Sequence, residues 1–235
     1  MKQIISVIIW IIGTIYLVLF VFLLIFISYI FKRKTYDPFI KMIARFLFKI
    51  IFIIVKLEGL ENIDKNAVYT IMGNHVSMFD IPLMFGFMPI PFNGIEASEH
   101  FKTPFYGWSL RRYGNIPMNR HNPRESLKSI LKGVDLIKHG TSIVILPEGT
   151  RTLEPKLGTF KKFPFVMAQK AEVPILPFAF SGLWKVNNKT TWLIRPGKII
   201  IRFGKPISTE TILSTKVDDL MVLTHEKIQD LISEP

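Results

Sequence analysis

The segment MGNHVSMFD, residues 72–80, places His75 and Asp80 five positions apart in a largely apolar neighbourhood. In a regular helix, residues five apart point about 140° away from each other. The two side chains therefore meet only if residues 75–79 form a turn and a helix starts near residue 79 or 80. In that geometry the aspartate holds the Nδ1 proton of the histidine and leaves Nε2 free to act as a base.

The same segment also has a purely structural interpretation. Asp80 is a favoured helix N-cap, and Pro82 is tolerated in a first helical turn. Ser77 lies between the histidine and the aspartate and suggests a hydrolase nucleophile, but no G-x-S-x-G elbow surrounds it. We expect Ser77 to form a hydrogen bond or a cap instead.

Alternating short apolar runs and stretches of helical period predict an α/β fold with a mixed, largely parallel sheet flanked by helices. The predicted strands lie near residues 67–73, 90–95, 114–118, 142–146, 173–180 and 192–203. The predicted helices lie near residues 79–88, 101–112, 123–138, 161–171 and 209–232.

Three of these predicted strands end in a polar cluster. The clusters are Asn74-His75, Asn119-Arg120, and the run from Pro147 to Arg151 that contains Glu148, Gly149 and Thr150. Each alone fits a surface or capping role. Because ligands bind beyond the carboxyl ends of strands in open α/β sheets, three clusters at one predicted edge favour a functional site.

A membrane segment is predicted at the start of the chain. Residues 4–31 carry no charge, and as a helix they would extend about 42 Å against a hydrocarbon core of roughly 30 Å. A cleaved signal normally has a shorter apolar core. The basic cluster at residues 32–34 places the following chain on the cytoplasmic face.

A second stretch, residues 39–56, is predicted to be an interfacial helix with a basic face. A core helix with solvated lysines is the alternative. The two helices also fit a kinked pair inserted in one leaflet, hinged near Gly13 or at Asp37-Pro38. We therefore divide the chain into a membrane-anchoring helical hairpin or pair, residues 1–58, and an α/β domain, residues 59–235.

Composition limits the partners and the chemistry. Thirty Lys and Arg against 18 Asp and Glu give a net charge of +12, which suits an anionic lipid surface, a phosphorylated substrate or an acidic carrier protein. The chain has no cysteine, which excludes disulfides and a cysteine acyl-enzyme. No nucleic-acid-binding signature is present, and we predict no metal site.

Four blocks resemble the glycerolipid acyltransferase family, in particular PlsC-type 1-acyl-sn-glycerol-3-phosphate acyltransferases. NHVSMFD matches the N-H-x-x-x-x-D block, GNIPMNR resembles the second block, LPEGTR with GTFKKFPFVMA matches the third, and VPILPFAFSG resembles the fourth. Their order spans most of residues 70–182.

The resemblance implies a membrane enzyme that moves a fatty acyl group to the sn-2 hydroxyl of lysophosphatidic acid and forms phosphatidic acid. The acyl donor is acyl-ACP or acyl-CoA, with no other cofactor. His75 is the implied general base, oriented by Asp80. The implied substrate-binding residues are Asn74, Arg120, Glu148, Gly149, Thr150, Arg151 and Lys161. The catalytic domain would lie on the cytoplasmic face of the cell membrane.

Some positions allow a second role or depart from the family pattern. Glu148 contacts the acceptor by resemblance, or alternatively bonds backbone amides of its own turn. The family often has an aspartate at Asn119 and a lysine at Ser98, where Lys102 is the nearby substitute. Backbone amides near residues 173–175 are candidate oxyanion donors by resemblance.

Three alternative functions share these features in part. Glycerol-3-phosphate or another lysophospholipid would fit every motif as an acceptor. A membrane-anchored nucleic-acid-binding protein would fit the charge, and a catalytically silent membrane scaffold would fit the helices. Neither of the last two explains why His, Asp, Glu and Arg recur at strand ends.

Overall fold

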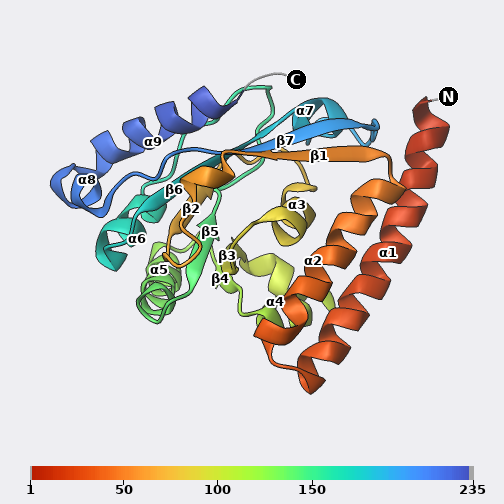
Figure 1. The fold of residues 1–235 in the computed structure, drawn as a ribbon, viewed down its shortest axis with the longest axis horizontal. Coiled ribbons are helices and arrows are strands. Elements are labelled where there is room, and N and C mark those ends of the chain that lie inside the picture. Colours follow the sequence, from red (N-terminus) through yellow and green to blue (C-terminus); the bar gives the residue numbers. More distant parts are fainter. Residues whose placement is uncertain (1, 233–235) are drawn as a thin grey trace.

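The computed structural model describes residues 2–232, which form a seven-stranded sheet between two layers of helices (Figure 1). The strands are β1 (Ile53–Glu58), β2 (Thr70–Gly73), β3 (Phe92–Ala97), β4 (Ile116–Met118), β5 (Ser142–Ile145), β6 (Ile175–Ser181) and β7 (Gly197–Phe203). The α-helices are α1 (Lys2–Ile30), α2 (Arg33–Ile50), α3 (Asp80–Phe87), α4 (Tyr106–Tyr113), α5 (Pro123–Lys138), α6 (Phe163–Ala171), α7 (Leu183–Val186), α8 (Thr209–Ser214) and α9 (Val217–Leu231). Two 3-10 helices are η1 (Leu60–Asn62) and η2 (Ser98–Lys102).

The strand order in the sheet is β1-β7-β6-β2-β5-β3-β4. Every neighbouring pair is parallel except β6 and β7. The predicted mixed, largely parallel sheet is therefore confirmed. The carboxyl ends of β6, β2, β5, β3 and β4 lie along one edge, and the polar clusters of the sequence follow three of them.

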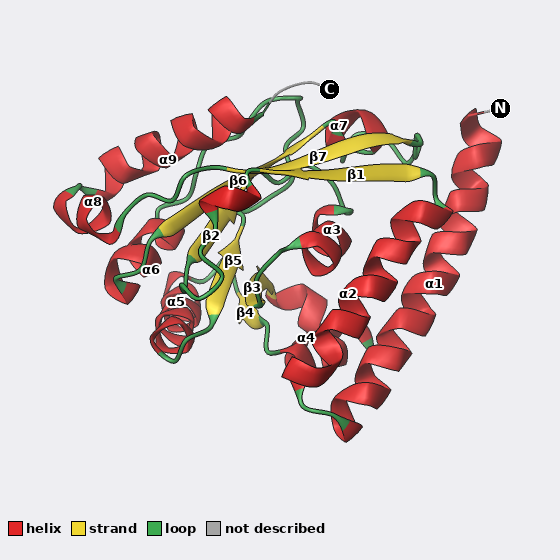
Figure 2. Ribbon diagram, in the orientation of Figure 1, coloured by secondary structure: helices red, strands yellow, loops and turns green. Residues whose placement is uncertain are grey.

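The two faces of the sheet bury separate apolar clusters. Ile71 belongs to the cluster under α2 and α3, whereas the next residue, Met72, belongs to the cluster under α5 and α6. This alternation follows from the two-residue period of a strand. Figure 2 shows the strands as one twisted layer with helices on both sides.

Two predicted helices are each divided in the structure. The predicted helix at 101–112 is η2 followed by α4, interrupted at Thr103-Pro104, where proline lacks the amide that would continue a helix. The predicted helix at 209–232 is α8 and α9, separated at Thr215-Lys216. The prediction for 123–138 is confirmed as α5, whose first turn is capped by the side chain of Asn122.

The predicted interfacial helix at 39–56 is wrong at its carboxyl end. Helix α2 stops at Ile50, the chain turns at Phe52 with a φ of 57°, and residues 53–58 form the edge strand β1, paired with β7. The run of isoleucine and valine at 50–55 favours a strand because β-branched residues are stiff in helices. The domain boundary at residue 58 remains a prediction, but residues 53–58, the last six of the predicted membrane-anchoring part, belong to the sheet.

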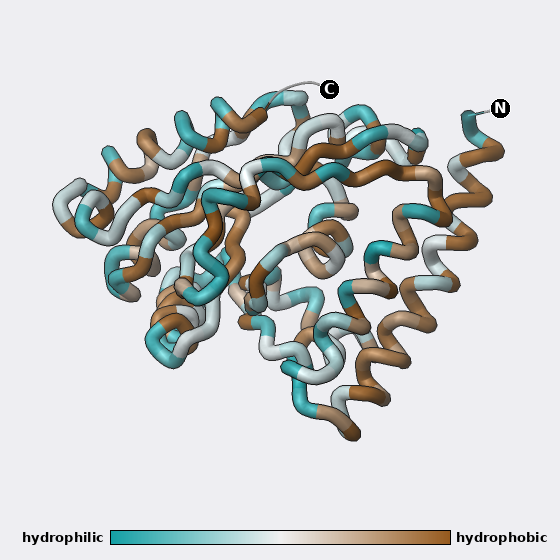
Figure 3. The backbone as a smooth tube through the Cα atoms, viewed as in Figure 1, coloured by the Kyte–Doolittle hydropathy of each residue, from teal (hydrophilic) through white to brown (hydrophobic). Residues whose placement is uncertain are grey.

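The two N-terminal helices form a hairpin whose turn lies at Phe31-Lys32. The hinges considered at Gly13 and at Asp37-Pro38 are both inside continuous helices. Within residues 2–232, α1 is the one helix long and apolar enough to cross a membrane. Figure 3 shows it hydrophobic along nearly its whole length, and most of its side chains are exposed.

Polar contacts join the hairpin to the α/β domain. The buried Asp37 accepts hydrogen bonds from the Tyr113 hydroxyl at 2.9 Å and from Lys41 Nζ at 3.1 Å. The Arg33 guanidinium lies 3.9 Å from the centre of the Tyr113 ring and donates to Asn93. A buried charge network of this kind fixes the position of the hairpin against the sheet.

Candidate active site at the carboxyl edge of the sheet

His75 and Asp80 meet as their spacing predicts. His75 follows the end of β2, a turn occupies the next four residues, and Asp80 begins α3. The distance from His75 Nδ1 to Asp80 Oδ2 is 2.5 Å. Because the ionised carboxylate only accepts hydrogen bonds, Nδ1 carries the proton and Nε2 is the unprotonated nitrogen of the neutral ring.

Asp80 is completely buried, whereas the His75 side chain keeps 18% of its surface exposed. The carboxylate also accepts the backbone amides of Val76 at 2.9 Å and of Ser77 at 3.2 Å. Burial raises the pKa of Asp80, and the hydrogen bonds from His75, Val76 and Ser77 act in the opposite direction. The amides of the turn thus fix the aspartate, and the aspartate orients the His75 ring. Of these two side chains, only the histidine reaches solvent.

Ser77 is fully committed to contacts within the protein. Its hydroxyl donates to Asn187 Oδ1 at 2.7 Å and accepts the amide of Phe79 at 3.3 Å. The residue is 1% exposed. The proton of this hydroxyl is directed to the Asn187 amide oxygen and not to His75, whose Nδ1 is bonded to Asp80. The geometry agrees with the expected hydrogen-bonding role.

Glu148, at the end of β5, holds the backbone of this turn. Its Oε1 accepts the His75 amide at 2.7 Å, and its Oε2 accepts the Gly158 amide at 2.9 Å. The carbonyl of His75 in turn accepts the Thr152 amide at 2.9 Å. Glu148 thus bonds backbone amides, as in its structural alternative, but they belong to the turn after β2 and to residue 158 and not to its own turn; its contact with an acceptor remains a prediction. Burial raises the pKa of Glu148, opposed by these two amides.

Gly158 was not predicted as a site residue, although it begins the GTFKKFPFVMA run of the third block. A Cβ atom at this position would lie 2.5 Å from Glu148 Oε2. Any other residue would therefore displace the carboxylate that supports His75. The signal available in the sequence was its place just after the LPEGTR block.

Asn74 points into the sheet. Its Nδ2 donates to the Phe180 carbonyl at 3.0 Å, and its Oδ1 accepts the Phe180 amide at 2.7 Å. The residue is 5% exposed, and backbone groups of β6 occupy both ends of its amide. The structure gives Asn74 internal partners, and the predicted substrate contact remains a prediction.

The turn after β5 gathers several cations. Gly149 has a φ of 69°, which favours glycine, and Arg151 follows two residues later. Lys161 lies alongside, since its Cγ would be 3.5 Å from a Cβ at Gly149. Lys189, which was not predicted, donates to Thr150 Oγ1 at 3.3 Å. Among residues 2–232, Arg151, Lys161 and Lys189 form no salt bridge.

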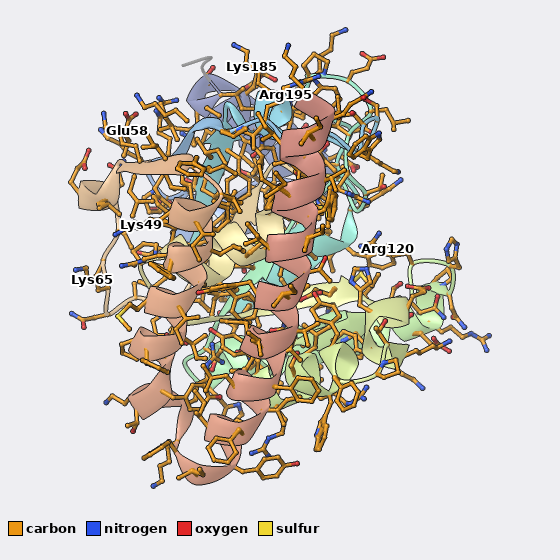
Figure 4. All side chains as sticks on the ribbon, turned by 90° about the vertical axis from the view of Figure 1, so that its right-hand side faces the viewer. Lys49, Glu58, Lys65, Arg120, Lys185 and Arg195 are labelled. Carbon is orange, nitrogen blue, oxygen red and sulfur yellow. The ribbon has the colours of Figure 1, made fainter. Side chains whose placement is uncertain are left out.

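Arg120 is farther from His75 than the other predicted residues. It follows β4, which is separated from β2 by β5 and β3, so the two strand axes are roughly 14 Å apart. The side chain is exposed and lies on the side of α1 away from α2 (Figure 4). Partial desolvation lowers the pKa of Arg120, and the nearby carboxylates of Glu99 and Glu96 act in the opposite direction. A substrate would have to bridge Arg120 and His75.

The suggested oxyanion donors at residues 173–175 lie at the wrong end of the sheet. Ile175 is level with Thr70, at the amino end of β2, whereas His75 follows its carboxyl end. The Ile175 amide is also used by the carbonyl of Ile207. Within residues 2–232, no group of three His, Cys, Asp or Glu side chains is placed to hold a metal ion.

The comparisons with known proteins agree with this geometry. A family model described as Acyltransferase matches residues 54–181. A 1-acyl-sn-glycerol-3-phosphate acyltransferase of Saccharomyces cerevisiae is 30% identical over 77% of this chain and 60% of its own length. One of Pseudomonas aeruginosa is 30% identical over 66% of this chain and 60% of its own length.

A chloroplast relative from Arabidopsis thaliana is 32% identical over 65% of this chain and 43% of its own length. The chain thus spans about half the length of the curated relatives it matches, between 43% and 60% in these three. A crystal structure of the 1-acyl-sn-glycerophosphate acyltransferase PlsC from Thermotoga maritima superposes with a TM-score of 0.83, at 25% identity, over 98% of this chain and 95% of that one. The chain belongs to the acyltransferase family.

Proposed function

We propose that this protein transfers a fatty acyl group from an acyl thioester to the sn-2 hydroxyl of 1-acyl-sn-glycerol-3-phosphate and so forms phosphatidic acid. One observation carries the proposal. His75 has its Nδ1 bonded to the buried Asp80 while part of the ring is exposed, next to a turn whose Arg151 has no carboxylate partner in the described chain. A base beside an unpaired guanidinium suits a hydroxyl acceptor that carries a phosphate.

The chemistry follows from the His75–Asp80 geometry. Nε2 removes the hydroxyl proton as the oxygen attacks the thioester carbonyl carbon. The tetrahedral intermediate then collapses, the carbon–sulfur bond breaks, and the imidazolium returns the proton to the leaving thiolate. The products are an ester and a free thiol. Asp80 stabilises the imidazolium throughout.

The phosphate of the acceptor would bind at the turn after β5. Arg151 offers a planar fork of donors that matches a phosphate, and Lys161 adds a point charge. Thr150 and Gly149 shape the same turn. Arg120 is a second cation, farther along the same edge of the sheet beyond β5 and β3, and an acceptor held by its phosphate at these cations would place its hydroxyl at Nε2.

The donor in this proposal is acyl-ACP or acyl-CoA. Both carry phosphate, and acyl carrier proteins are acidic, so either complements a chain of net charge +12. The thioester itself supplies the activation, and the reaction uses no other cofactor.

Helix α1 is apolar enough to anchor the protein in a membrane, and we place the site on the cytoplasmic face. The domain contacts α1 near both ends. Ser6 bonds Ile194, and the carbonyl of Ser28 accepts Arg112 at 2.5 Å. These two serines are 22 residues apart, about 33 Å along a helix, slightly more than the roughly 30 Å of the hydrocarbon core. If α1 crossed the bilayer, these two contacts would hold the domain at the depth of the hydrocarbon core. The hairpin in this proposal therefore lies in one leaflet.

Purified protein in vesicles tests the proposal. We expect mass spectrometry to detect phosphatidic acid from lysophosphatidic acid with at least one of the two donors, and His75→Ala to abolish turnover. An acceptor panel decides the substrate, because a product formed only from glycerol-3-phosphate or another lysophospholipid would move the assignment within the family. Full transfer by His75→Ala would overturn the base, and no transfer to any acceptor would favour a non-catalytic binding protein.

A further inference from the structure

The connection between α7 and β7 lies against the candidate active site from the side of β6. Its residues 187–194 are named here the brace loop. Asn187, 2% exposed, begins the brace loop, and Ile194, 3% exposed, ends it. Figure 4 labels Arg195, which directly follows the brace loop, near the N-terminal end of α1, and the Ile194 amide before it is bonded to Ser6 of that helix.

At one end, the brace loop binds the turn that carries His75. Asn187 Oδ1 accepts the Ser77 hydroxyl at 2.7 Å, and the Ser77 amide donates to Asp80 at 3.2 Å. The amide group of Asn187 also orders the brace loop itself, because its Nδ2 donates to the carbonyl of Leu193 at 3.1 Å. Asn187 therefore joins the loop to the aspartate through a single intermediate residue.

At the other end, the brace loop is bonded to α1. Ser6 Oγ accepts the Ile194 amide at 3.0 Å, and Trp10 Nε1 donates to the Trp192 carbonyl at 2.8 Å. Ser6 is completely buried within a helix whose other side chains are mostly exposed and apolar. A membrane anchor alone has no need of a buried serine at this position, whereas a helix that holds a loop does.

We propose that Asn187 is a positioning residue, and that α1 acts through the brace loop to hold the His75–Asp80 turn in its reactive geometry. The inference rests on the proposed function, because it assigns His75 as the base. The path runs from Ser6 by a hydrogen bond to Ile194 and along the chain to Leu193. From there it continues by hydrogen bonds through Asn187 and Ser77 to Asp80. The hairpin would then be part of the catalytic scaffold as well as an anchor.

The physical basis is the sensitivity of proton transfer to the orientation of the ring. Asp80 fixes His75, but Asp80 is itself held by the amides of the turn at residues 76 and 77. If Ser77 loses its partner, the turn gains freedom and the reactive orientation becomes less populated. Arg151 and Lys161 lie outside the brace loop, so this loss should change the binding of the acceptor phosphate to these two cations little.

Two variants cut the path at different points. We expect Asn187→Ala and Ser6→Ala each to lower kcat about tenfold, since one hydrogen bond lost changes a rate by roughly that factor, with KM for the acceptor unchanged. The double variant should show little further loss, because both changes break the same path. Matched controls are Asn188→Ala, which removes bonds to Trp184 of α7 and to Thr190 of the brace loop but none to the His75 turn or to α1, and Ser28→Ala, which changes the far end of α1.

Hydrogen exchange provides a readout independent of turnover. The amides of Val76 and Ser77 should exchange faster in Asn187→Ala and in Ser6→Ala than in the wild type or in either control, at equal melting temperature. Unchanged exchange would overturn the inference whether or not the protein transfers acyl groups. The inference would also be overturned if the two losses of kcat multiplied in the double variant. The same holds if Asn188→Ala lost as much kcat as Asn187→Ala. A wild-type protein without acyl transfer would instead refute the proposed function, while the exchange result still decides whether the path exists.

Discussion

The backbone amide of His75 and the carboxylate of Glu148 are bonded directly, with 2.7 Å between N and Oε1. The candidate base is therefore held by two buried carboxylates. Asp80 binds the ring, and Glu148 binds the main chain from the end of a neighbouring strand. A histidine held at both its ring and its backbone loses little entropy when a substrate arrives, which is the condition for a pre-organised base.

Replacing Asp80 by asparagine should change the tautomer of His75. Asp80 Oδ2 accepts both the His75 ring and the Val76 amide, so an asparagine whose NH2 group takes the place of Oδ2 faces Nδ1 with a donor and gives up the Val76 contact. The ring proton would then move to Nε2, and the base would be lost. We expect kcat to fall by roughly 100-fold to 10000-fold, with a small change in KM.

Asp37→Asn is the matched control for that experiment, because Asp37 is also buried and hydrogen-bonded but lies in the hairpin. It should lower the melting temperature and leave kcat within about twofold. Equal losses of kcat in the two variants would show that any buried aspartate matters, and would contradict a specific orienting role.

Ser77→Ala distinguishes a nucleophile from a hydrogen-bonding residue. A nucleophile would be indispensable, whereas a residue that holds the turn should leave about a tenth of the activity. We also expect no acyl-enzyme in the wild type, which mass spectrometry of the intact protein after rapid quenching with donor alone would check. A covalent acyl adduct at Ser77 would refute direct transfer.

Arg151→Ala should weaken acceptor binding. A charged hydrogen bond to phosphate supports an increase of KM for lysophosphatidic acid of roughly 10-fold to 100-fold, with kcat at saturation largely kept. Lys156→Ala is the control, since Lys156 is an exposed cation of the same loop and is paired with Glu154. An increase of KM for the thioester alone would assign Arg151 to the donor.

Glu148 should make stability depend on pH. Burial raises the pKa of Glu148 above its ordinary value of 4.5, so the native protein holds this proton more tightly than the unfolded chain does. Stability is therefore greatest below pH 4.5 with respect to this group and falls as the pH rises through the native pKa. Glu148→Gln should remove that contribution to the slope in urea unfolding between pH 4 and about 7. An unchanged slope would contradict the shift.

The orientation of α1 is accessible to chemical labelling because the chain has no cysteine. For a hairpin in one leaflet, Lys2→Cys and Lys34→Cys should both react with an impermeant maleimide in inside-out vesicles and neither in intact spheroplasts. Lys65→Cys, on an exposed loop of the domain (Figure 4), marks the cytoplasmic side. Labelling of the Lys2 variant from outside would show that α1 crosses the bilayer.

The sheet was predictable because its strands are short apolar runs bounded by turn residues, as at 142–145. Helix α5 was predicted with its correct ends, since Asn122 and Pro123 start it and Gly140 follows it. Strand β1 was missed because its Lys56 continues the basic spacing of α2, and only pairing with β7 reveals that the backbone is extended. Sequence periodicity does not contain that long-range contact.

The contact between His75 and Asp80 was predictable for the opposite reason, since the two residues are close in sequence and one turn brings them together. Asn187 was not, because it lies 110 positions from Ser77 and belongs to no recognisable motif. Lys189 reaches Thr150 only because α7 returns the chain to the β5 turn. Motifs identify residues that are contiguous in the chain, and the residues that support them come from the fold.

Asn74 shows how the end of β2 is finished. Gly73 is the last residue of β2 paired with β6, and the Asn74 side chain then makes the donor and acceptor contacts with Phe180 that a further backbone residue would have made. The Asn74 side chain thus replaces one backbone pair of the sheet, so the main chain leaves the sheet early without unpaired groups on β6. A designer who transplants this histidine turn to another parallel sheet would therefore need to carry the asparagine with it.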